Sequence, residues 1–410
     1  MPAPAPATPT HRVALVTGVL DLGGTTTFLC NLGGELIRRG IPAAVFSFKA
    51  HNPLGSEFER QGIPVFTTDQ RRMIYEDCQA RILRELSRFR PTVVVGSLAA
   101  DAFESLRYAP PGMFRIGMAQ SHDPGVYRTI SFYAGQLDAM GAVSRAIHAT
   151  IPTLPAFAGV RVHYLPYGVP MPPARVADPR AADSPLRILY IGRLEESQKR
   201  VRCFPEILAT LAASGIPFHW TIAGDGAEAP WLHEHVKSPS ATQTVSFLGK
   251  VQYADVPRVL ADHDIYLLAS GFEGLPLSLL EAMAGGVVPV VSDIPSGVGE
   301  VVDSDSGVLV NPDQIPAYAE AIIRLHHQRS EFHRLRRNVR EKVEREYSVA
   351  AMTDRWMKIL PPAPTQPPAW PARHRILPIL MGADSWRFTA PVRFARRWGL
   401  RLKNAARGVN

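Results

Sequence analysis

The hydrophobic positions of this 410-residue chain fall into short apolar runs that alternate with longer amphipathic stretches. Such runs occupy Val13–Thr17, Ala43–Phe48 and Arg187–Ile191, each followed by a turn-forming or charged segment. A short continuous apolar run is typical of a strand that a parallel sheet buries on both faces. Stretches between the runs, such as Phe28–Arg39 and Arg72–Arg90, have helical spacing. The alternation predicts doubly wound α/β domains.

This pattern is sharpest in the stretch 264–296. An apolar run, Ile265–Ala269, leads into a glycine-rich turn, and Pro276 stands where the first helical position of a new helix is expected. A second apolar run, Val287–Val291, follows the helix. The turn therefore lies at the carboxyl end of a strand, which is where open α/β sheets bind their ligands.

The turn combines groups that bind phosphate with groups that bind sugar. Free backbone N–H groups and the dipole of the following helix form an anion site, and Glu273 and Glu281 add two carboxylates. A carboxylate accepts hydrogen bonds from vicinal hydroxyls, as on a ribose or a hexose. A sugar nucleotide suits both sets of groups. The remaining candidate binding residues of the turn are Gly274, Leu275, Pro276 and Leu277.

The segment FEGLPLSLLEAMA, residues 272–284, resembles the Glu-x7-Glu motif of the retaining glycosyltransferases of family 4. The resemblance covers roughly residues 13–360 and implies the GT-B fold, with two Rossmann-like doubly wound domains facing a central cleft. It further implies that Glu281 binds the ribose hydroxyls. Glu273 and the N–H groups after it would hold the hexose. The competing interpretation makes both carboxylates ordinary surface groups.

Two loops in the first half of the chain extend the resemblance. Gly23 and Gly24 follow the first strand, where the family has a glycine loop near the donor diphosphate. His122 lies in a polar loop after a strand, where a family histidine faces the transferred sugar. A plain tight turn and a solvated surface histidine remain the alternatives. Ser144 is expected to cap a short helix.

The second half resembles the family at two further loops. Arg193 and Lys199 correspond to the family's phosphate-binding cations, which would offset the charge of a departing nucleoside diphosphate. Arg200 replaces the family's glycine, and the acidic insert 195–197 precedes it, so the sequence leaves the position of Lys199 open. Gly224, Asp225 and Gly226 match a G-D-G turn, which either contacts the nucleotide or only turns the chain.

The net charge of +8 belongs to the C-terminal end of the chain. Residues 361–410 hold nine Arg or Lys and one acidic residue, Asp384, so the remainder has a balance of zero. Residues 391–406 form a basic amphipathic pattern with Trp398, which predicts binding to an anionic membrane surface. A tail that packs on the body or is disordered is the alternative. Nucleic acid is not expected, because no recognition motif accompanies the charge.

The remaining features favour a cytoplasmic enzyme, either free or peripheral on the inner face of the cell membrane. Three scattered cysteines without C-x-x-C spacing indicate neither a zinc site nor a disulfide framework. No Asp-x-Asp metal signature stands out and no cofactor motif is evident, so the sugar nucleotide is the expected co-substrate. The expected organisation is a lead at 1–12, a first domain at 13–168, a linker at 169–185, a second domain at 186–345, a crossover helix at 346–360 and a tail at 361–410.

The resemblance implies transfer of a hexose, with retention, from a UDP- or GDP-sugar to a saccharide or lipid-linked acceptor in cell-surface polysaccharide or glycolipid synthesis. Two other classes remain open. One is a GT-B relative with different sugar-nucleotide chemistry, such as an epimerase or a phosphorylase. The other is a sugar-nucleotide-binding protein without catalysis, against which the intact set of Arg193, Lys199, Glu273 and Glu281 argues.

Overall fold

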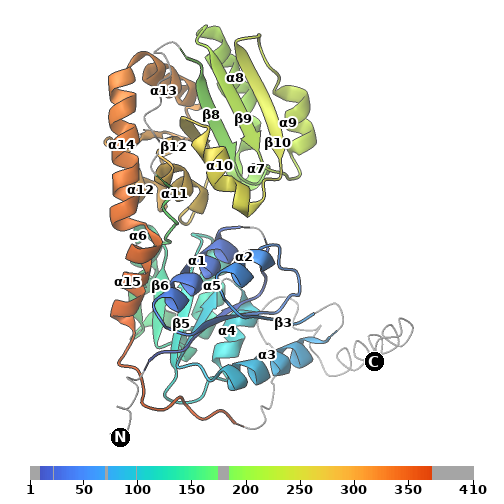
Figure 1. Cartoon of the computed structure of the whole chain (residues 1–410), viewed down its shortest axis with the longest axis vertical. Helices are drawn as coiled ribbons and strands as arrows, with labels where there is room; N and C mark the ends of the chain where they lie inside the picture. The colour runs from blue at the N-terminus through green and yellow to red at the C-terminus, as the bar shows by residue number, and fades with distance from the viewer. Residues whose placement is uncertain (1–9, 22, 70–72, 98, 174–183, 372–410) are drawn as a thin grey trace, which may run out of the picture. The chain divides into compact units, whose positions relative to one another are not determined.

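The computed structural model describes residues 10–21, 23–69, 73–97, 99–173 and 184–371 (Figure 1). The predicted lead, most of the predicted linker and the basic segment 391–406 therefore lie outside the described residues, wholly or in large part. The described residues divide into two compact units. The first contains those within Met1–Ala142, His148–Leu165 and Thr353–Asn410, and the second contains those within Val143–Ile147 and Pro166–Met352.

The first unit is built on a parallel sheet of seven strands in the order β3-β2-β1-β4-β5-β6-β7. β1 lies between β2 and β4, with Val13 in register with both Ala43 and Val93. Every residue of β1 is buried, as its continuous apolar run predicts. The strands are β1 Val13–Thr17, β2 Ala43–Ser47, β3 Val65–Thr67, β4 Val93–Ser97, β5 Phe114–Ala119, β6 Ala139–Ala142 and β7 Arg161–Tyr164.

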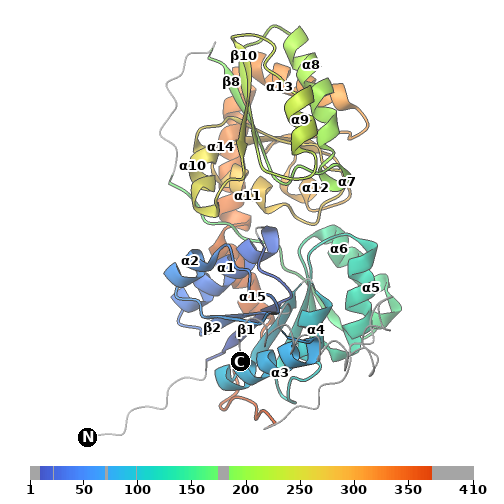
Figure 2. The ribbon, with the colours of Figure 1, turned by 90° about the vertical axis from the view of Figure 1, so that its right-hand side faces the viewer.

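Helices lie on both faces of this sheet (Figure 2). α1 begins at Gly24, earlier than the predicted Phe28. Its first turn contains Thr26 and Thr27, which are buried and have a low helix propensity. Ser144 Oγ accepts a hydrogen bond from the Ile147 N–H at 3.2 Å, which confirms the predicted cap. The helices are α1 Gly24–Arg38, α2 Gly55–Arg60, α3 Tyr75–Phe89, α4 Ala100–Leu106, α5 Pro124–Tyr133 and α6 Arg145–Thr150.

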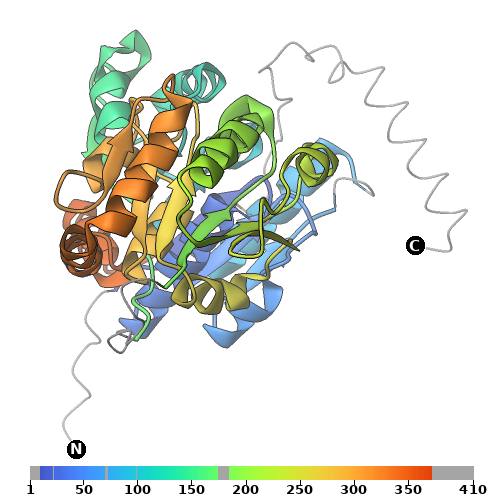
Figure 3. The ribbon, with the colours of Figure 1, turned by 90° about the horizontal axis from the view of Figure 1, so that it is seen from above.

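The second unit has a parallel sheet of six strands in the order β10-β9-β8-β11-β12-β13, again with helices on both faces (Figure 3). Its strands are β8 Leu186–Ile191, β9 Phe218–Ala223, β10 Gln243–Gly249, β11 Ile265–Leu268, β12 Val288–Ser292 and β13 Val308–Val310. Its helices are α7 Glu196–Lys199, α8 Phe204–Ala213, α9 Ala229–His235, α10 Val256–Ala261, α11 Leu277–Ala284, α12 Val298–Val301, α13 Ile315–His327 and α14 Arg329–Glu346.

One boundary in this unit differs from the prediction. Pro276 is the N-cap of α11 rather than its first helical residue, with ψ of 116°, which is an extended conformation. Its carbonyl accepts from the Leu279 N–H at 3.2 Å. The helix therefore starts one residue later, and the turn that precedes it is correspondingly longer.

The last helix, α15 (Val349–Ile359), carries the chain from the second unit into the first. Trp356 packs on Phe28 with ring centroids 6.1 Å apart, and Asp354 accepts from Arg39 at 2.6 Å. These contacts explain why residues after 352 group with the start of the chain. Within the described ranges, no helix combines the length and the apolar character that crossing a bilayer requires.

Candidate functional site

Three loops of the second unit meet at the carboxyl ends of β8, β9 and β11. The backbone carbonyl of Asp225 accepts from the Leu194 N–H at 2.9 Å, which joins the G-D-G turn to the loop that carries Arg193. A Cβ on Gly224 would lie 1.8 Å from the Gly192 carbonyl oxygen, and φ at Gly224 is +147°. Only glycine fits there. The contacts show the G-D-G turn as the support of the Arg193 loop.

Arg193 presents a largely exposed guanidinium from this loop, with 63% of its side chain accessible. Its Nη1 lies 2.9 Å from Glu195 Oε2, and its Nη2 donates to Gln198 Oε1 at 2.6 Å. The buried Tyr190 hydroxyl donates to the Arg193 carbonyl at 2.6 Å and so fixes the backbone below it. Arg193 is therefore accessible to a ligand but already has an acidic partner.

Lys199 lies at the end of α7 and forms a buried ion pair with Glu273, with Nζ and Oε1 2.5 Å apart. The two side chains are 11% and 6% exposed, so water screens this pair little. Arg200 follows in the left-handed conformation, at φ 50° and ψ 41°, which glycine adopts most readily. Arg200 thus adopts the left-handed backbone conformation that a glycine would adopt at this position, and the Lys199 side chain points toward Glu273.

Gln198 connects these two charge pairs, and the sequence did not identify it. Its Nε2 lies 3.2 Å from both Glu273 Oε2 and the Phe272 carbonyl oxygen, while its Oε1 accepts from Arg193. Its backbone carbonyl also accepts from the Gly271 N–H at 2.8 Å. The chain Glu195–Arg193–Gln198–Glu273–Lys199 contains two cations and two anions joined by one amide. The only sequence signal was its place between two predicted cations.

The N-terminus of α11 lies beside this chain and supplies backbone donors. No hydrogen bond between described residues uses the N–H of Gly274, Leu275 or Leu277. The Gly274 carbonyl accepts from the Gly297 N–H at 2.6 Å, which holds the turn in place. Further along α11, burial raises the pKa of the Glu281 carboxyl to about 7. The region therefore offers unpaired N–H groups at the N-terminus of α11 and a carboxyl with a raised pKa within the helix.

The first unit holds the other predicted residues, Gly23, Gly24 and His122. Gly23 is the N-cap of α1, and His122 directly precedes Asp123, whose Oδ1 caps α5 by accepting from Gly125 at 2.7 Å. His122 Nδ1 lies 2.5 Å from the Tyr127 hydroxyl, a partner that the sequence did not indicate. The predicted site residues thus form two groups, one on each unit.

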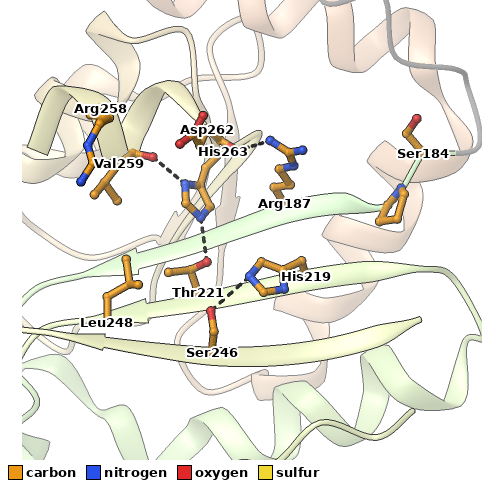
Figure 4. Close-up of a pocket in the computed structure, with 11 residues that line it drawn as sticks. Ser184, Arg187, His219, Thr221, Ser246, Leu248, Arg258, Val259, Asp262 and His263 are labelled. Carbon is orange, nitrogen blue, oxygen red and sulfur yellow. Dashed lines mark hydrogen bonds between the residues drawn. The ribbon is translucent and has the colours of Figure 1, made fainter. Parts of the chain in front are cut away.

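A pocket of about 800 Å³ lies elsewhere on the second unit (Figure 4). His263 Nε2 bonds the Thr221 hydroxyl at 2.8 Å, and Ser246 bonds His219 Nε2 at 3.1 Å. Burial lowers the pKa of both histidines, and the Arg187 charge adds to this at His219. These polar side chains satisfy one another, and none of the pocket's residues is a predicted site residue. The pocket is therefore not the candidate site.

Among the described residues, no group of three or more His, Cys, Asp or Glu side chains is placed to hold a metal ion. The three cysteines are buried, and none of them forms a disulfide. Burial raises the pKa of the Cys30 and Cys203 thiols to about 12, so neither is a reactive thiolate near neutral pH.

The sequence similarity to a known protein family lies in the second unit. Residues 185–328 match the family model described as glycosyl transferases group 1. The amylovoran biosynthesis glycosyltransferase AmsK of Erwinia amylovora is 32% identical over 175 residues, which are 41% of this chain and 42% of AmsK. The chain spans less than half the length of the first curated relatives it matches. The resemblance to this family is confirmed over the matched residues.

Solved structures extend the likeness to most of the chain. TarM of S. aureus superposes with a TM-score of 0.71 at 12% identity, over 85% of this chain and 99% of TarM. HepE of Anabaena, in complex with UDP, superposes with a TM-score of 0.67 at 16% identity, over 85% and 98%. The predicted fold class, GT-B with two Rossmann-like doubly wound domains, is confirmed.

Proposed function

We propose that this protein is a retaining glycosyltransferase that moves a hexose from a UDP- or GDP-sugar to a saccharide or lipid-linked acceptor. One observation carries the proposal. The buried Lys199–Glu273 pair and the accessible Arg193 meet at the N-terminus of α11, inside the segment that matches glycosyl transferases group 1. Cations, free N–H groups and carboxylates together suit a nucleoside diphosphate sugar.

The diphosphate would bind to Arg193, Lys199 and the N–H groups of the α11 turn. Charge on the leaving nucleoside diphosphate increases as the sugar–oxygen bond breaks, and positive groups already in place stabilise that charge without reorganising. Arg193 would exchange its contact with Glu195 for a phosphoryl oxygen. Gln198 bonds both Arg193 and Glu273. A movement of Arg193 toward the phosphate would therefore change the hydrogen bonding of the Glu273 carboxylate.

The hexose would lie against Glu273, and the ribose against Glu281. A carboxylate has about four acceptor positions, so Glu273 can keep Lys199 and Gln198 and still accept from a sugar hydroxyl. Gly23 and Gly24 would approach the phosphates from the first unit. His122, held by Tyr127, would touch the sugar or the acceptor.

Retention would follow same-face attack by the acceptor, with the leaving phosphate assisting deprotonation. We propose no metal and no further cofactor, and the sugar nucleotide is the co-substrate. The printed names of AmsK and of the Salmonella typhimurium lipopolysaccharide 1,6-galactosyltransferase, 31% identical over 144 residues, support a saccharide acceptor in surface polysaccharide assembly. Binding of residues 391–406 to the inner face of the cell membrane belongs to the proposal on sequence grounds.

A screen of UDP- and GDP-sugars tests the proposal. The wild-type chain should release UDP or GDP slowly from one donor, faster with acceptor, and the anomeric proton of the product should show the donor's configuration by NMR. Arg193→Ala should abolish release, whereas Arg258→Ala, exposed and beside the separate pocket, should not. Inversion in the product would overturn the retaining mechanism. Release without acceptor consumption would favour an epimerase-like reaction.

A further inference from the structure

The pocket of about 800 Å³ in the second unit begins at the amino ends of strands whose carboxyl ends carry the candidate donor site. Arg187 and His219 are the second residues of β8 and β9 and lie in register, and His263 comes shortly before β11. The pocket extends along β10 as far as Leu248. All its lining residues belong to the second unit, so one unit alone forms it. Its volume is within the roughly 300–1,000 Å³ that is typical of small-molecule sites.

Hydrogen bonds hold two imidazole rings in the wall of this pocket (Figure 4). Burial lowers the pKa of both rings, so each is neutral at pH 7. His263 Nδ1 lies 2.6 Å from the Val259 carbonyl oxygen, which can only accept, so Nε2 accepts from the Thr221 hydroxyl. His219 bonds hydroxyls of β10 through both ring nitrogens, at 2.6 and 3.1 Å. This part of the wall is therefore rigid and uncharged.

Two side chains of opposite charge line the same pocket without pairing. Arg187 Nη1 donates to the Asp262 backbone carbonyl at 3.3 Å, and no ion pair joins Arg187 to a described carboxylate. The Asp262 carboxylate has no hydrogen bond or ion pair within the described ranges. Both residues are exposed. A guanidinium with four N–H donors to spare thus lies in the same pocket as a carboxylate whose acceptor positions are free.

This combination selects against a charged ligand. An anion bound to Arg187 would face the Asp262 carboxylate, and a cation bound to Asp262 would face the guanidinium. Arg258 also lines the pocket, but its side chain is 79% exposed and lies 3.7 Å from Asp255, so its charge is largely screened. A neutral polyhydroxyl compound suits both groups, because its hydroxyls donate to a carboxylate and accept from a guanidinium.

We propose that this pocket is a second saccharide site, which binds an uncharged oligosaccharide and is separate from the donor site. Leu248, which is 50% exposed, supplies apolar surface for the C–H face of a sugar ring. The inference rests on the proposed function only for its role, since such a chain has the chemistry of a saccharide acceptor. A polymer held here would keep further acceptor ends near the enzyme at a raised effective concentration.

Two variants test the site, Arg187→Met and Asp262→Ala. Neutral linear oligosaccharides of glucose, of galactose and of mannose are titrated by calorimetry into the full chain without nucleotide. The wild type should bind at least one of them. Each variant should weaken that binding about tenfold, the scale of one hydrogen bond to a charged group. Both should melt as the wild type does, because the two side chains are exposed.

Matched substitutions elsewhere serve as controls. Arg334→Met removes an exposed arginine of α14 outside the pocket and should leave oligosaccharide affinity unchanged. Leu248→Ser should weaken binding, whereas Phe132→Ser, at a residue of the first unit that is 52% exposed, should not. Affinity for UDP or GDP should stay at the wild-type value in Arg187→Met and Asp262→Ala, because neither residue belongs to the donor site.

The contrary outcomes separate this site from the proposed function. A wild type that binds UDP or GDP but none of the oligosaccharides overturns the site and leaves the proposed function standing. Wild-type oligosaccharide affinity in either Arg187→Met or Asp262→Ala also overturns it. Inorganic phosphate that binds in place of the oligosaccharides, and is lost in Arg187→Met, would make the pocket an anion site instead. If an oligosaccharide binds but UDP, GDP and their sugars do not, the proposed function is wrong and the saccharide site stands.

Discussion

The two units prepare for a ligand in opposite ways. In the second unit the charged groups are already paired: Arg193 with Glu195, and Lys199 with Glu273. In the first unit one amide nitrogen beside α1, Gln120 Nε2, has no hydrogen-bond partner among the described residues. Under the proposed function a ligand exchanges the contact of Arg193 with Glu195, whereas Glu273 keeps both Lys199 and Gln198. Substitutions should therefore affect stability and binding together in the buried pair, and separately elsewhere.

The largest effect is expected for Lys199→Ala. It leaves the Glu273 carboxylate buried without its cation, which should lower the free energy of unfolding by about 3–5 kcal/mol and abolish turnover. Urea unfolding and donor release measure the two losses. Arg334→Ala, which breaks the exposed pair with Asp305, should cost less than about 1 kcal/mol.

A double variant, Lys199→Met with Glu273→Met, separates the two roles of this pair. Replacing a buried ion pair by apolar side chains is often neutral, so most of the stability should return while turnover stays absent. Restored turnover in the double variant would show that Lys199 and Glu273 are not part of the donor site. A Lys199→Ala loss no larger than that of Arg334→Ala would show that the pair is solvated.

The next largest effect is expected for Arg193→Ala, which should weaken ligand binding without lowering stability. The side chain is exposed, so the free energy of unfolding should change by less than about 1 kcal/mol. Affinity for UDP or GDP should fall about 10- to 100-fold, because a hydrogen bond to a charged group is lost. Calorimetry with the same ligand measures it, and unchanged affinity would exclude Arg193 from the diphosphate site.

The pH dependence of binding should identify Glu281. Its carboxyl has a pKa of about 7 in the unliganded protein, so below that pH it is mostly protonated, while ribose hydroxyls require the ionised acceptor. Affinity for UDP or GDP should therefore rise with pH up to about pH 7, by up to about tenfold per unit, and level off above it. Glu281→Gln should remove this part of the profile and leave only the titration of the phosphates.

Stability should show the opposite sign. Because the folded-state pKa of Glu281 is raised above the ordinary value of 4.5, the folded state retains a proton that the unfolded chain loses between those values. Its contribution to the free energy of unfolding should fall as pH rises from about 5 to 7. A Glu281→Gln variant with the wild-type pH dependence of both stability and affinity would contradict the raised pKa.

The smallest structural effect is expected for Gly23→Ala. An added Cβ meets nothing within 4 Å, so the free energy of unfolding should change by less than about 1 kcal/mol, the scale of a changed N-cap. UDP or GDP affinity should still fall several-fold if phosphate approaches the α1 N-terminus there. Gly224→Ala is the contrast, because its Cβ would clash with the Gly192 carbonyl and destabilise the fold. Unchanged affinity of Gly23→Ala for UDP or GDP would show that the phosphate does not bind close to Gly23.

Local pattern was sufficient to predict the central strands, because burial on both faces requires a continuous apolar run. β1 matches its predicted bounds residue for residue. The start of α1, the ten-residue helix α5 and the short elements α2, β3 and β7 were not predicted. Thr26 and Thr27 are buried in the first turn of α1 although threonine has a low helix propensity. The elements α2, β3 and β7 have only three to six residues each and carry little periodicity of their own.

The sequence by itself determined which loops hold the candidate site residues, because turn residues and their spacing to Glu273, Glu281, Arg193 and Lys199 are properties of neighbouring positions. Only the tertiary structure decided how those groups are paired. Gln198 reaches Glu273 across 75 positions, and Thr25 reaches Gln120 across 95. Such pairings depend on which strand ends the sheet order brings together, and that order follows from packing the whole domain rather than from any local run of residues.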